Sequence, residues 1–155
     1  MIRLALADRQ QALRLDKTAL RRIARDVLAG EGVTEAEISL VFVDDDEMQA
    51  LNRRHLAHDY PTDVLSFLLE AEETDAGRRI DAEIIISTQT AAREAPRFGW
   101  STASEVTLYL VHGLLHACGY DDLAPREKAR MRRVERAALR RAGLEPRYRG
   151  RNRAE

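Results

Sequence analysis

The sequence predicts one α+β domain of mixed α/β character, in which several helices cover a sheet of about four strands. Short alternating or β-branched apolar runs recur along the chain, and segments whose apolar residues have helical spacing separate them. The chain has 155 residues, of which 45% are hydrophobic, and this is enough for one ordinary core. We therefore expect a single domain at 1–145 and a basic, flexible tail at 146–155.

The first half of the chain predicts two strands and two helices. Apolar residues alternate along 2–7, which favours a strand, and Asp16 can cap a helix over about 17–29. The β-branched run 38–43 favours a second strand. Asp44 then follows as a cap for a short helix whose first turn is acidic, where carboxylates suit the helix dipole.

The second half predicts two further strands followed by three helices. Apolar runs at 64–69 and 81–87 favour the strands, and the polar segment 70–79 is expected to connect them as a hairpin loop. The helices are expected at 88–97, from Ser101 or Thr102 through the two histidines that follow, and from Pro125 to Ala142.

Charge is distributed unevenly along the chain although the formal net charge is only -1. From Ala124 onward, twelve Lys and Arg residues stand against four Glu residues. An acidic body with an arginine-rich end is an arrangement that nucleic-acid binders use, because arginines neutralise phosphates. Within this basic end, we expect the last helix to guide RNA through Arg130, Arg133 and Arg140.

The cellular compartment is predicted from two features. Cys118 is the only cysteine, so no intrachain disulfide can form, and this favours a reducing compartment. The N-terminus lacks a long apolar segment, and no stretch is long enough to span a membrane. We expect a cytoplasmic protein without a membrane partner.

The chemistry centres on the segment VHGLLHACGYDDL at 111–123. His112 and His116 lie one turn apart on one helix face, Gly119 lets the chain turn back, and a carboxylate follows in the pattern H-x-x-x-H-x-x-G-x-x-D. Such a set suits one zinc ion with three protein ligands and one open position. Asp122 is expected as the third ligand with Asp121 orienting a neighbour, although the reverse assignment is equally open.

One alternative and one missing residue argue against a catalytic zinc site of the protease kind. Histidines at this spacing also occur by chance on helices, where they are satisfied as buried polar groups without any metal. Gly113 stands where proteases with the H-E-x-x-H motif carry their glutamate base.

Several blocks together make the chain resemble the YbeY-type endoribonucleases, the rRNA maturation factor family. The resembling blocks are Leu51-Asn52, Pro61 to Phe67, Ile84 to Ser87, His112 to Asp122 and the last helix with Met131. The resemblance implies a metal-dependent, single-strand-specific ribonuclease that matures the 3′ end of 16S rRNA and acts in ribosome quality control. It also implies rRNA, and the small ribosomal subunit with its associated proteins, as partners.

The family's motif is matched only in part. Its zinc ligands are three histidines in a run resembling HGxLHLxGYDH, so His112 and His116 match, whereas Asp122 replaces the third histidine. A functional arginine of the family falls on Leu56, and Arg53 or Arg54 could reach in from the preceding helix instead. A family glycine is replaced by Ala82, beside Glu83 in the acidic position.

Three functions are therefore compared. The first is a zinc-dependent endoribonuclease, in which Asp63 and Ser66 contact substrate or support a ligand; both side chains can equally cap a strand end. The nucleophile could be water or the 2′-hydroxyl of the RNA. The second is a catalytically weak, ribosome-associated RNA-binding protein, and the third is a small zinc metalloprotease, against which Gly113 argues.

Overall fold

The computed structural model describes residues 1–56, 63–148 and 151, without the side chains of 55 and 56. The bounds of its elements, of which η1 is a 3-10 helix, are β1 Ile2–Arg9, α1 Lys17–Gly30, β2 Val33–Val43, α2 Asp45–Leu56, β3 Val64–Thr74, β4 Gly77–Ser87, α3 Thr88–Glu94, η1 Ala95–Phe98, α4 Thr102–Ala117 and α5 Pro125–Arg141. The predicted α+β fold is confirmed.

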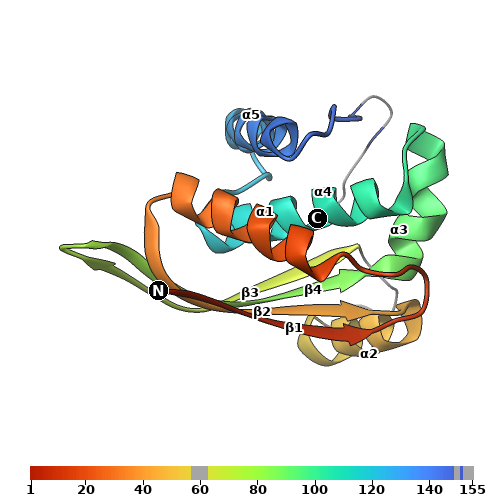
Figure 1. Cartoon of the computed structure of the whole chain (residues 1–155), viewed down its shortest axis with the longest axis horizontal. Coiled ribbons are helices and arrows are strands. Elements are labelled where there is room, and N and C mark those ends of the chain that lie inside the picture. The colour runs from red at the N-terminus through yellow and green to blue at the C-terminus, as the bar shows by residue number, and fades with distance from the viewer. Residues whose placement is uncertain (57–62, 149–150, 152–155) are drawn as a thin grey trace.

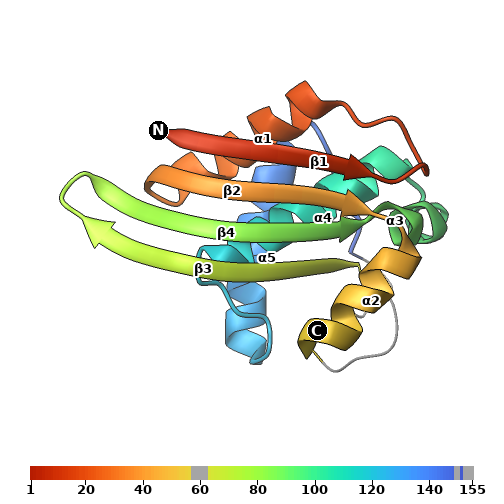
Figure 2. The same cartoon turned by 90° about the horizontal axis from the view of Figure 1, so that it is seen from below.

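The sheet has the strand order β1-β2-β4-β3. Strands β1, β2 and β4 are parallel, whereas β3 pairs antiparallel with β4 and forms one edge of the sheet. The reason is local: α1 carries the chain back between β1 and β2, while a tight turn joins β3 directly to β4. Figure 2 shows β3 along the edge of the sheet, with α4 and α5 behind it.

Helix α4 is the central element of the fold. Together with α1 it covers one face of the sheet, and α5 packs on it from the outer side (Figure 1). Its side chains are buried on nearly every side, from Glu105 through Leu115. The apolar sequence of this helix follows from that position, since a helix enclosed by neighbours has no solvent face.

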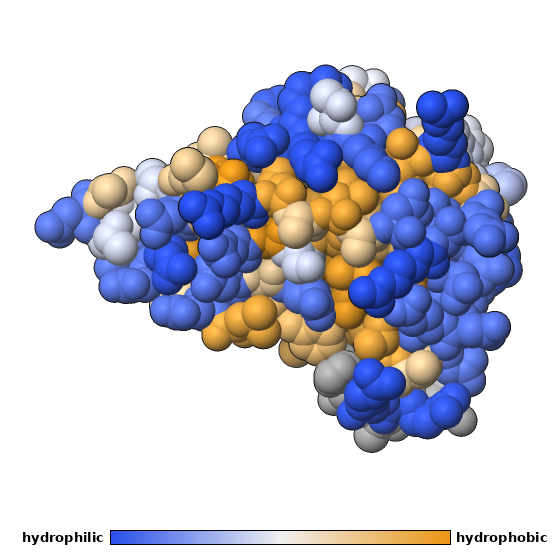
Figure 3. Space-filling model, turned by 60° about the horizontal axis from the view of Figure 1, so that its bottom comes forward, coloured by the Kyte–Doolittle hydropathy of each residue, from blue (hydrophilic) through white to orange (hydrophobic). Residues whose placement is uncertain are grey.

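The opposite face of the sheet is covered only in part, by α2 (Figure 1). Met48 of this helix packs with Val41, Leu65 and Ile85 of the sheet in a second, smaller core. Figure 3 shows hydrophobic residues gathered across the middle of this face, with polar side chains around them. Asp45 fastens the start of α2, because its carboxylate accepts hydrogen bonds from side chains of β4 and α3.

The sheet differs from the sequence prediction at the hairpin. The segment 70–79 was expected to be a loop, but β3 and β4 run through it and only Asp75-Ala76 form the turn. Both faces of this arm are polar, so the alternation of apolar residues that predicts strands is missing. Ladder hydrogen bonds and ion pairs such as Arg78 with Glu73 hold it instead.

The predicted helix starts are confirmed. The side chain of Asp16 accepts a hydrogen bond from the backbone of Ala19, and Asp44 does the same for Glu47. Ser101, rather than Thr102, caps α4. In the part of the chain that the structure describes, no helix combines the length and apolarity needed to cross a membrane.

Candidate metal centre

Two imidazoles and one carboxylate converge beside the C-terminal half of α4. The Nε2 atoms of His112 and His116 lie 3.1 Å apart. The Oδ2 atom of Asp122 lies 3.4 Å from the first and 3.6 Å from the second. His112 is 4% exposed, whereas 26% of the His116 side chain is exposed, so the cluster is buried on one side and reaches the surface on the other.

The turn after α4 brings the carboxylate back to the histidines. Gly119 has a φ of 103°, a backbone conformation that side chains with a Cβ rarely adopt. The amide of Gly119 donates to the carbonyl of His116, and that of Tyr120 donates to the carbonyl of Leu115. These bonds end the helix as a tight C-terminal cap and direct the following residues towards the imidazoles.

The Nδ1 atom of each histidine faces an acceptor. For His112 this acceptor is the carboxylate of Glu135, at 2.7 Å, and for His116 it is the backbone carbonyl of Tyr120, at 3.0 Å. A carbonyl can only accept, and an ionised carboxylate also only accepts, so both Nδ1 atoms carry the proton. Both Nε2 atoms are then bare lone pairs that point at each other and at Asp122.

Three acceptors this close repel one another unless a proton or a metal cation lies between them, and a divalent metal ion fits. Ligand atoms roughly 2.0–2.1 Å from a tetrahedral zinc lie about 3.3 Å apart, close to the three separations found here. An added proton is the less favourable solution, because burial and the neighbouring His112 lower the pKa of His116. His112, His116 and Asp122 can therefore hold a metal ion.

The two adjacent carboxylates have different surroundings. The side chain of Asp122 is 8% exposed, and the adjacent imidazole of His112 lowers its pKa. Asp121 instead accepts a hydrogen bond from the backbone amide of Leu123 at 3.0 Å, as residues that open a turn do. The geometry thus favours Asp122 over Asp121 as the third ligand.

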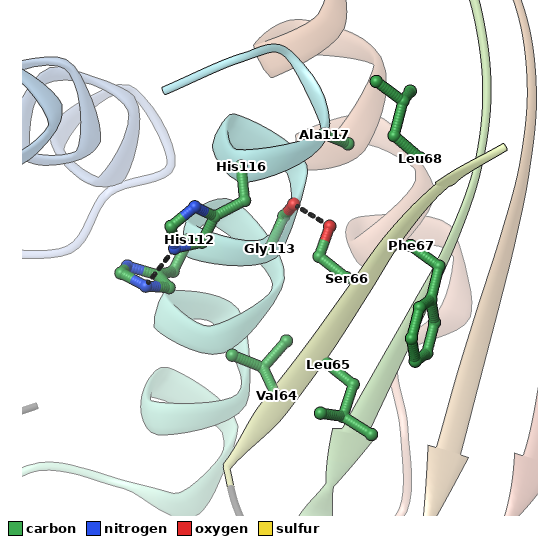
Figure 4. Close-up of a pocket in the computed structure, with 9 residues that line it drawn as sticks. All are labelled: Val64, Leu65, Ser66, Phe67, Leu68, His112, Gly113, His116 and Ala117. Atoms are coloured by element: carbon green, nitrogen blue, oxygen red, sulfur yellow. Dashed lines mark hydrogen bonds between the residues drawn. The ribbon is translucent and has the colours of Figure 1, made fainter. Parts of the chain in front are cut away.

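A groove of about 360 Å³ lies between β3 and α4, next to the histidines. The hydroxyl of Ser66 donates to the carbonyl of Gly113 at 2.9 Å and so ties the edge strand to the helix (Figure 4). Asp63 accepts from the amide of Val64 at the start of β3. Of the two residues proposed for substrate contacts, Ser66 lines this groove with the candidate ligands.

Gly113 marks a close approach of α4 to the sheet. A Cβ atom there would lie 2.8 Å from Cγ2 of Ile84 and 3.0 Å from Cγ2 of Val64. Figure 4 shows Gly113 facing β3, while the two imidazoles project from another side of the helix. The position that holds the glutamate base in H-E-x-x-H proteases thus has no room for a side chain here.

The predicted RNA-binding arginines fall on different parts of the surface. Arg53 and Arg54 are exposed on α2, which lies on the other face of the sheet from α4 (Figure 1). On α5, Arg130 stacks over the ring of Tyr120, Arg133 is exposed, and Arg140 pairs with Glu145. The position of Leu56 is helical, but its side chain lies outside the described residues.

A different pair of cations on α5 lines a small cavity with the candidate ligands. Lys128 and Arg132 share this cavity with His112 and Asp122. They are one helical turn apart, whereas Arg130 and Arg133 point roughly the opposite way around the same helix. Because Lys128 and Arg132 are the cations beside the cluster, they are better placed than the predicted arginines to contact a bound anion.

Sequence reasoning also missed Glu135, which bonds His112. Its signal was present: Glu135 lies four residues after Met131, on the same face of α5 as the buried Ala138 and Leu139. A charged residue on the apolar face of an amphipathic helix indicates a buried partner, because unpaired buried charges are costly. The partner itself lies on another helix, and the sequence does not identify it.

Known proteins match this sequence over most of its length. The family model described as "Endoribonuclease YbeY" matches residues 5–143. A relative from Pelotomaculum thermopropionicum named "Endoribonuclease YbeY" is 44% identical over 81% of this chain and 85% of its own length. Another of that name, from Syntrophus aciditrophicus, is 37% identical over 85% of this chain and 84% of its own length.

A solved structure supports the fold independently. The solution structure of TM1509 from Thermotoga maritima has a TM-score of 0.62 at 23% identity, covering 92% of this chain and 89% of that one. Identity at that level speaks for the fold alone. The family model spans most of the sheet, α4 and the turn after it, and the two relatives match over 81% and 85% of the chain, so the chain belongs to the Endoribonuclease YbeY family.

Proposed function

We propose that this protein is a zinc-dependent endoribonuclease that cleaves single-stranded RNA and takes part in maturing the 3′ end of 16S rRNA. One observation carries the proposal within the family: Nε2 of His112, Nε2 of His116 and Oδ2 of Asp122 converge within 3.1 to 3.6 Å, while each Nδ1 atom faces an acceptor. Such a set is made for one divalent cation, with Asp122 rather than Asp121 as the third ligand.

A bound zinc would supply a water of lowered pKa and would stabilise negative charge on a phosphoryl oxygen. The surrounding residues prepare this chemistry. Glu135 and the carbonyl of Tyr120 fix which nitrogen of each imidazole faces the cluster. Asp122 makes the ligand set one charge more negative than three histidines, which offsets one of the two charges of the cation.

The substrate is bound, in this proposal, across the groove and the adjoining basic side chains. Lys128 and Arg132 lie beyond the ligands and can contact a phosphate of the substrate, whereas Ser66, whose hydroxyl bonds Gly113, forms part of the groove wall. Single-stranded RNA suits an open groove at a sheet edge, since its phosphates and bases are not confined in a helix. Because the substrate belongs to the small ribosomal subunit, we place the activity in the cytoplasm.

The alternative functions are weaker. A zinc protease needs a general base beside its metal, and the contacts at Gly113 leave no space for one. An RNA-binding protein with little nuclease activity remains the second candidate, because Asp122 and Leu56 depart from the residues that the family resemblance implies. Cleavage assays separate the two.

Single-stranded and duplex RNA oligonucleotides containing the 3′-terminal sequence of 16S rRNA, together with casein, provide the test. We expect cleavage of the single strand alone, loss of cleavage with a chelator, and recovery on adding zinc. His112→Ala should abolish it. Binding without cleavage would favour the second candidate, and casein hydrolysis that His112→Ala removes would favour the third. Cyclic 2′,3′-phosphate ends on the products would identify the 2′-hydroxyl as nucleophile.

A further inference from the structure

Glu135 connects the candidate metal ligand His112 to the C-terminal segment of the chain. The residue is 2% exposed, and its two carboxylate oxygens have different partners. Oε2 accepts from Nδ1 of His112 and Oε1 accepts from the hydroxyl of Tyr148, each at 2.7 Å. The carboxylate therefore bridges α4 to a residue that follows the last helix.

The surroundings of Tyr148 keep its hydroxyl protonated, so that it can donate a hydrogen bond. Burial and the nearby carboxylate of Glu135 raise the pKa of Tyr148, so the hydroxyl keeps its proton. Arg132 stacks over its ring at 4.4 Å and Arg136 at 5.5 Å. These cations hold the ring against α5 while the hydroxyl faces Glu135.

Three residues further on, Arg151 anchors the same segment at the other end of α4. Its guanidinium donates to both carboxylate oxygens of Glu105, at 2.6 and 2.7 Å. It also lies 3.6 Å above the centre of the Phe98 ring. Glu105 is fully buried, and the side chain of Arg151 is 4% exposed.

Arg151 contacts Glu105 of α4 directly, whereas Tyr148 is connected to His112 of α4 through Glu135 of α5. Glu105 and His112 are two helical turns apart, so their side chains project in the same direction. Tyr148 and Arg151 are thus both linked to the helix that carries the two histidines. A buried bidentate ion pair holds it at one end, and at the other a tyrosine reaches the carboxylate that orients His112.

We propose that the C-terminal segment is a positioning element of the metal centre: Arg151 docks it on α4, and docking brings the hydroxyl of Tyr148 to Glu135, which holds His112 with Nε2 towards the metal. Tyr148 and Arg151 are then positioning residues that act through Glu135. The inference rests on the metal site proposed above, and it extends that site to Tyr148 and Arg151.

Metal affinity measured against a chromophoric chelator with Zn²⁺ tests this in the full-length protein. Tyr148→Phe removes only the hydroxyl and keeps the stacked ring. We expect it to bind zinc about tenfold more weakly, the lower end of the effect that partners of metal-bound histidines have. Urea unfolding in the presence of a chelator should show a single transition at a moderately lower midpoint, because the ring still fills its site while the buried carboxylate of Glu135 loses one donor. Zinc affinity equal to that of the wild type would overturn the proposal.

Arg151→Ala tests the docking step. It should weaken zinc binding by a similar factor, and combining it with Tyr148→Phe should weaken binding no further, because both changes remove the same hydrogen bond. Independent, multiplying effects would overturn the coupling. If Arg151→Ala alone unfolds the protein by leaving a buried charge unpaired, Glu105→Gln with Arg151→Ala removes that charge and gives the same comparison.

Two controls separate this inference from others. Arg141→Ala removes the ion pair of α5 with Asp26, far along the helix from the ligands, and zinc affinity should stay at the wild-type value. A loss as large as that of Arg151→Ala would mean that any loosening of α5 suffices, and would overturn a specific role for the segment. If wild type itself binds no zinc that His116→Ala abolishes, the proposed metal site fails, and this inference fails with it.

Discussion

Replacing Gly113 by alanine tests whether α4 is pressed against the sheet as closely as the structure shows. The added Cβ would lie 2.8 Å from Ile84 and 3.0 Å from Val64, well inside the roughly 3.5–4.0 Å at which carbon atoms attract. Both neighbours are β-branched side chains on strands, and Ile84 is fully buried, so neither can turn away freely. Overpacking of this kind costs about 1–3 kcal/mol.

Helix propensity acts in the opposite direction. Alanine is favoured over glycine in a helix interior by about 1 kcal/mol, so the net loss of stability for Gly113→Ala should be about 0–2 kcal/mol. Gly30→Ala is the matched control, because a Cβ at this last residue of α1 would meet only Arg141, at 3.8 Å. That change should be neutral or stabilising. The predicted order of stability is therefore Gly30→Ala, wild type, Gly113→Ala.

Urea unfolding with a chelator present measures both variants without the contribution of bound metal. If Gly113→Ala proves as stabilising as Gly30→Ala, the reasoning is refuted: α4 can then move off the sheet at little cost. The argument against a protease would lose its basis too, since a gap that opens for alanine could open for glutamate.

Three further predictions concern the ligands, the basic helix and the buried ion pair. Elemental analysis should find about one zinc per chain in the wild type and in Asp121→Ala, and little in His116→Ala or Asp122→Ala; retention in Asp122→Ala with loss in Asp121→Ala would exchange the two carboxylates. Changing Lys128 and Arg132 to glutamine should flatten the dependence of RNA affinity on salt, by ~0.7 in log–log slope for each phosphate contact that is lost. The triple change of Arg130, Arg133 and Arg140 should flatten it less. The reverse order would favour the arginines predicted from the sequence. Burial alone would raise the pKa of Glu105, but hydrogen bonds from Arg151, Tyr109 and Trp100 bring it below the ordinary 4.5, so the folded state binds fewer protons and loses stability as the pH falls below about 4.5. Urea unfolding of Glu105→Gln should show a smaller loss over that range, and an equal loss would assign it to other groups.

The elements that the sequence predicted well, and the candidate ligands that it expected to lie together, are those whose signals are local. Asp16 and Asp44 cap helices a few residues away, and His112, His116 and Asp122 are brought together by one helix and one turn. The polar hairpin arm was missed because pairing with a neighbouring strand, and not burial, makes it a strand. Sequence patterns report burial, and they say little about segments held by backbone ladders in water.

The contacts that orient the ligands are the part that the sequence could not show. Glu135 reaches His112 across two packed helices, and Tyr148 reaches Glu135 from beyond the last one. No spacing along the chain encodes such contacts, because they depend on how α4 and α5 cross.

The candidate ligands lie close together in the sequence, whereas the partner that orients His112 lies on another helix, and this has a physical consequence for the site. A helix and a turn place the donor atoms near one another at once, but three acceptors brought together without a cation repel, and the neutral imidazoles could rotate apart. The carbonyl of Tyr120 holds His116 from within the turn itself, whereas His112 depends on Glu135 of α5. His112 is therefore the ligand whose orientation requires the whole domain to be folded. The acceptor set is complete only when α5 has packed. Metal binding at this site therefore depends on tertiary structure, although the candidate ligands lie close together in the sequence.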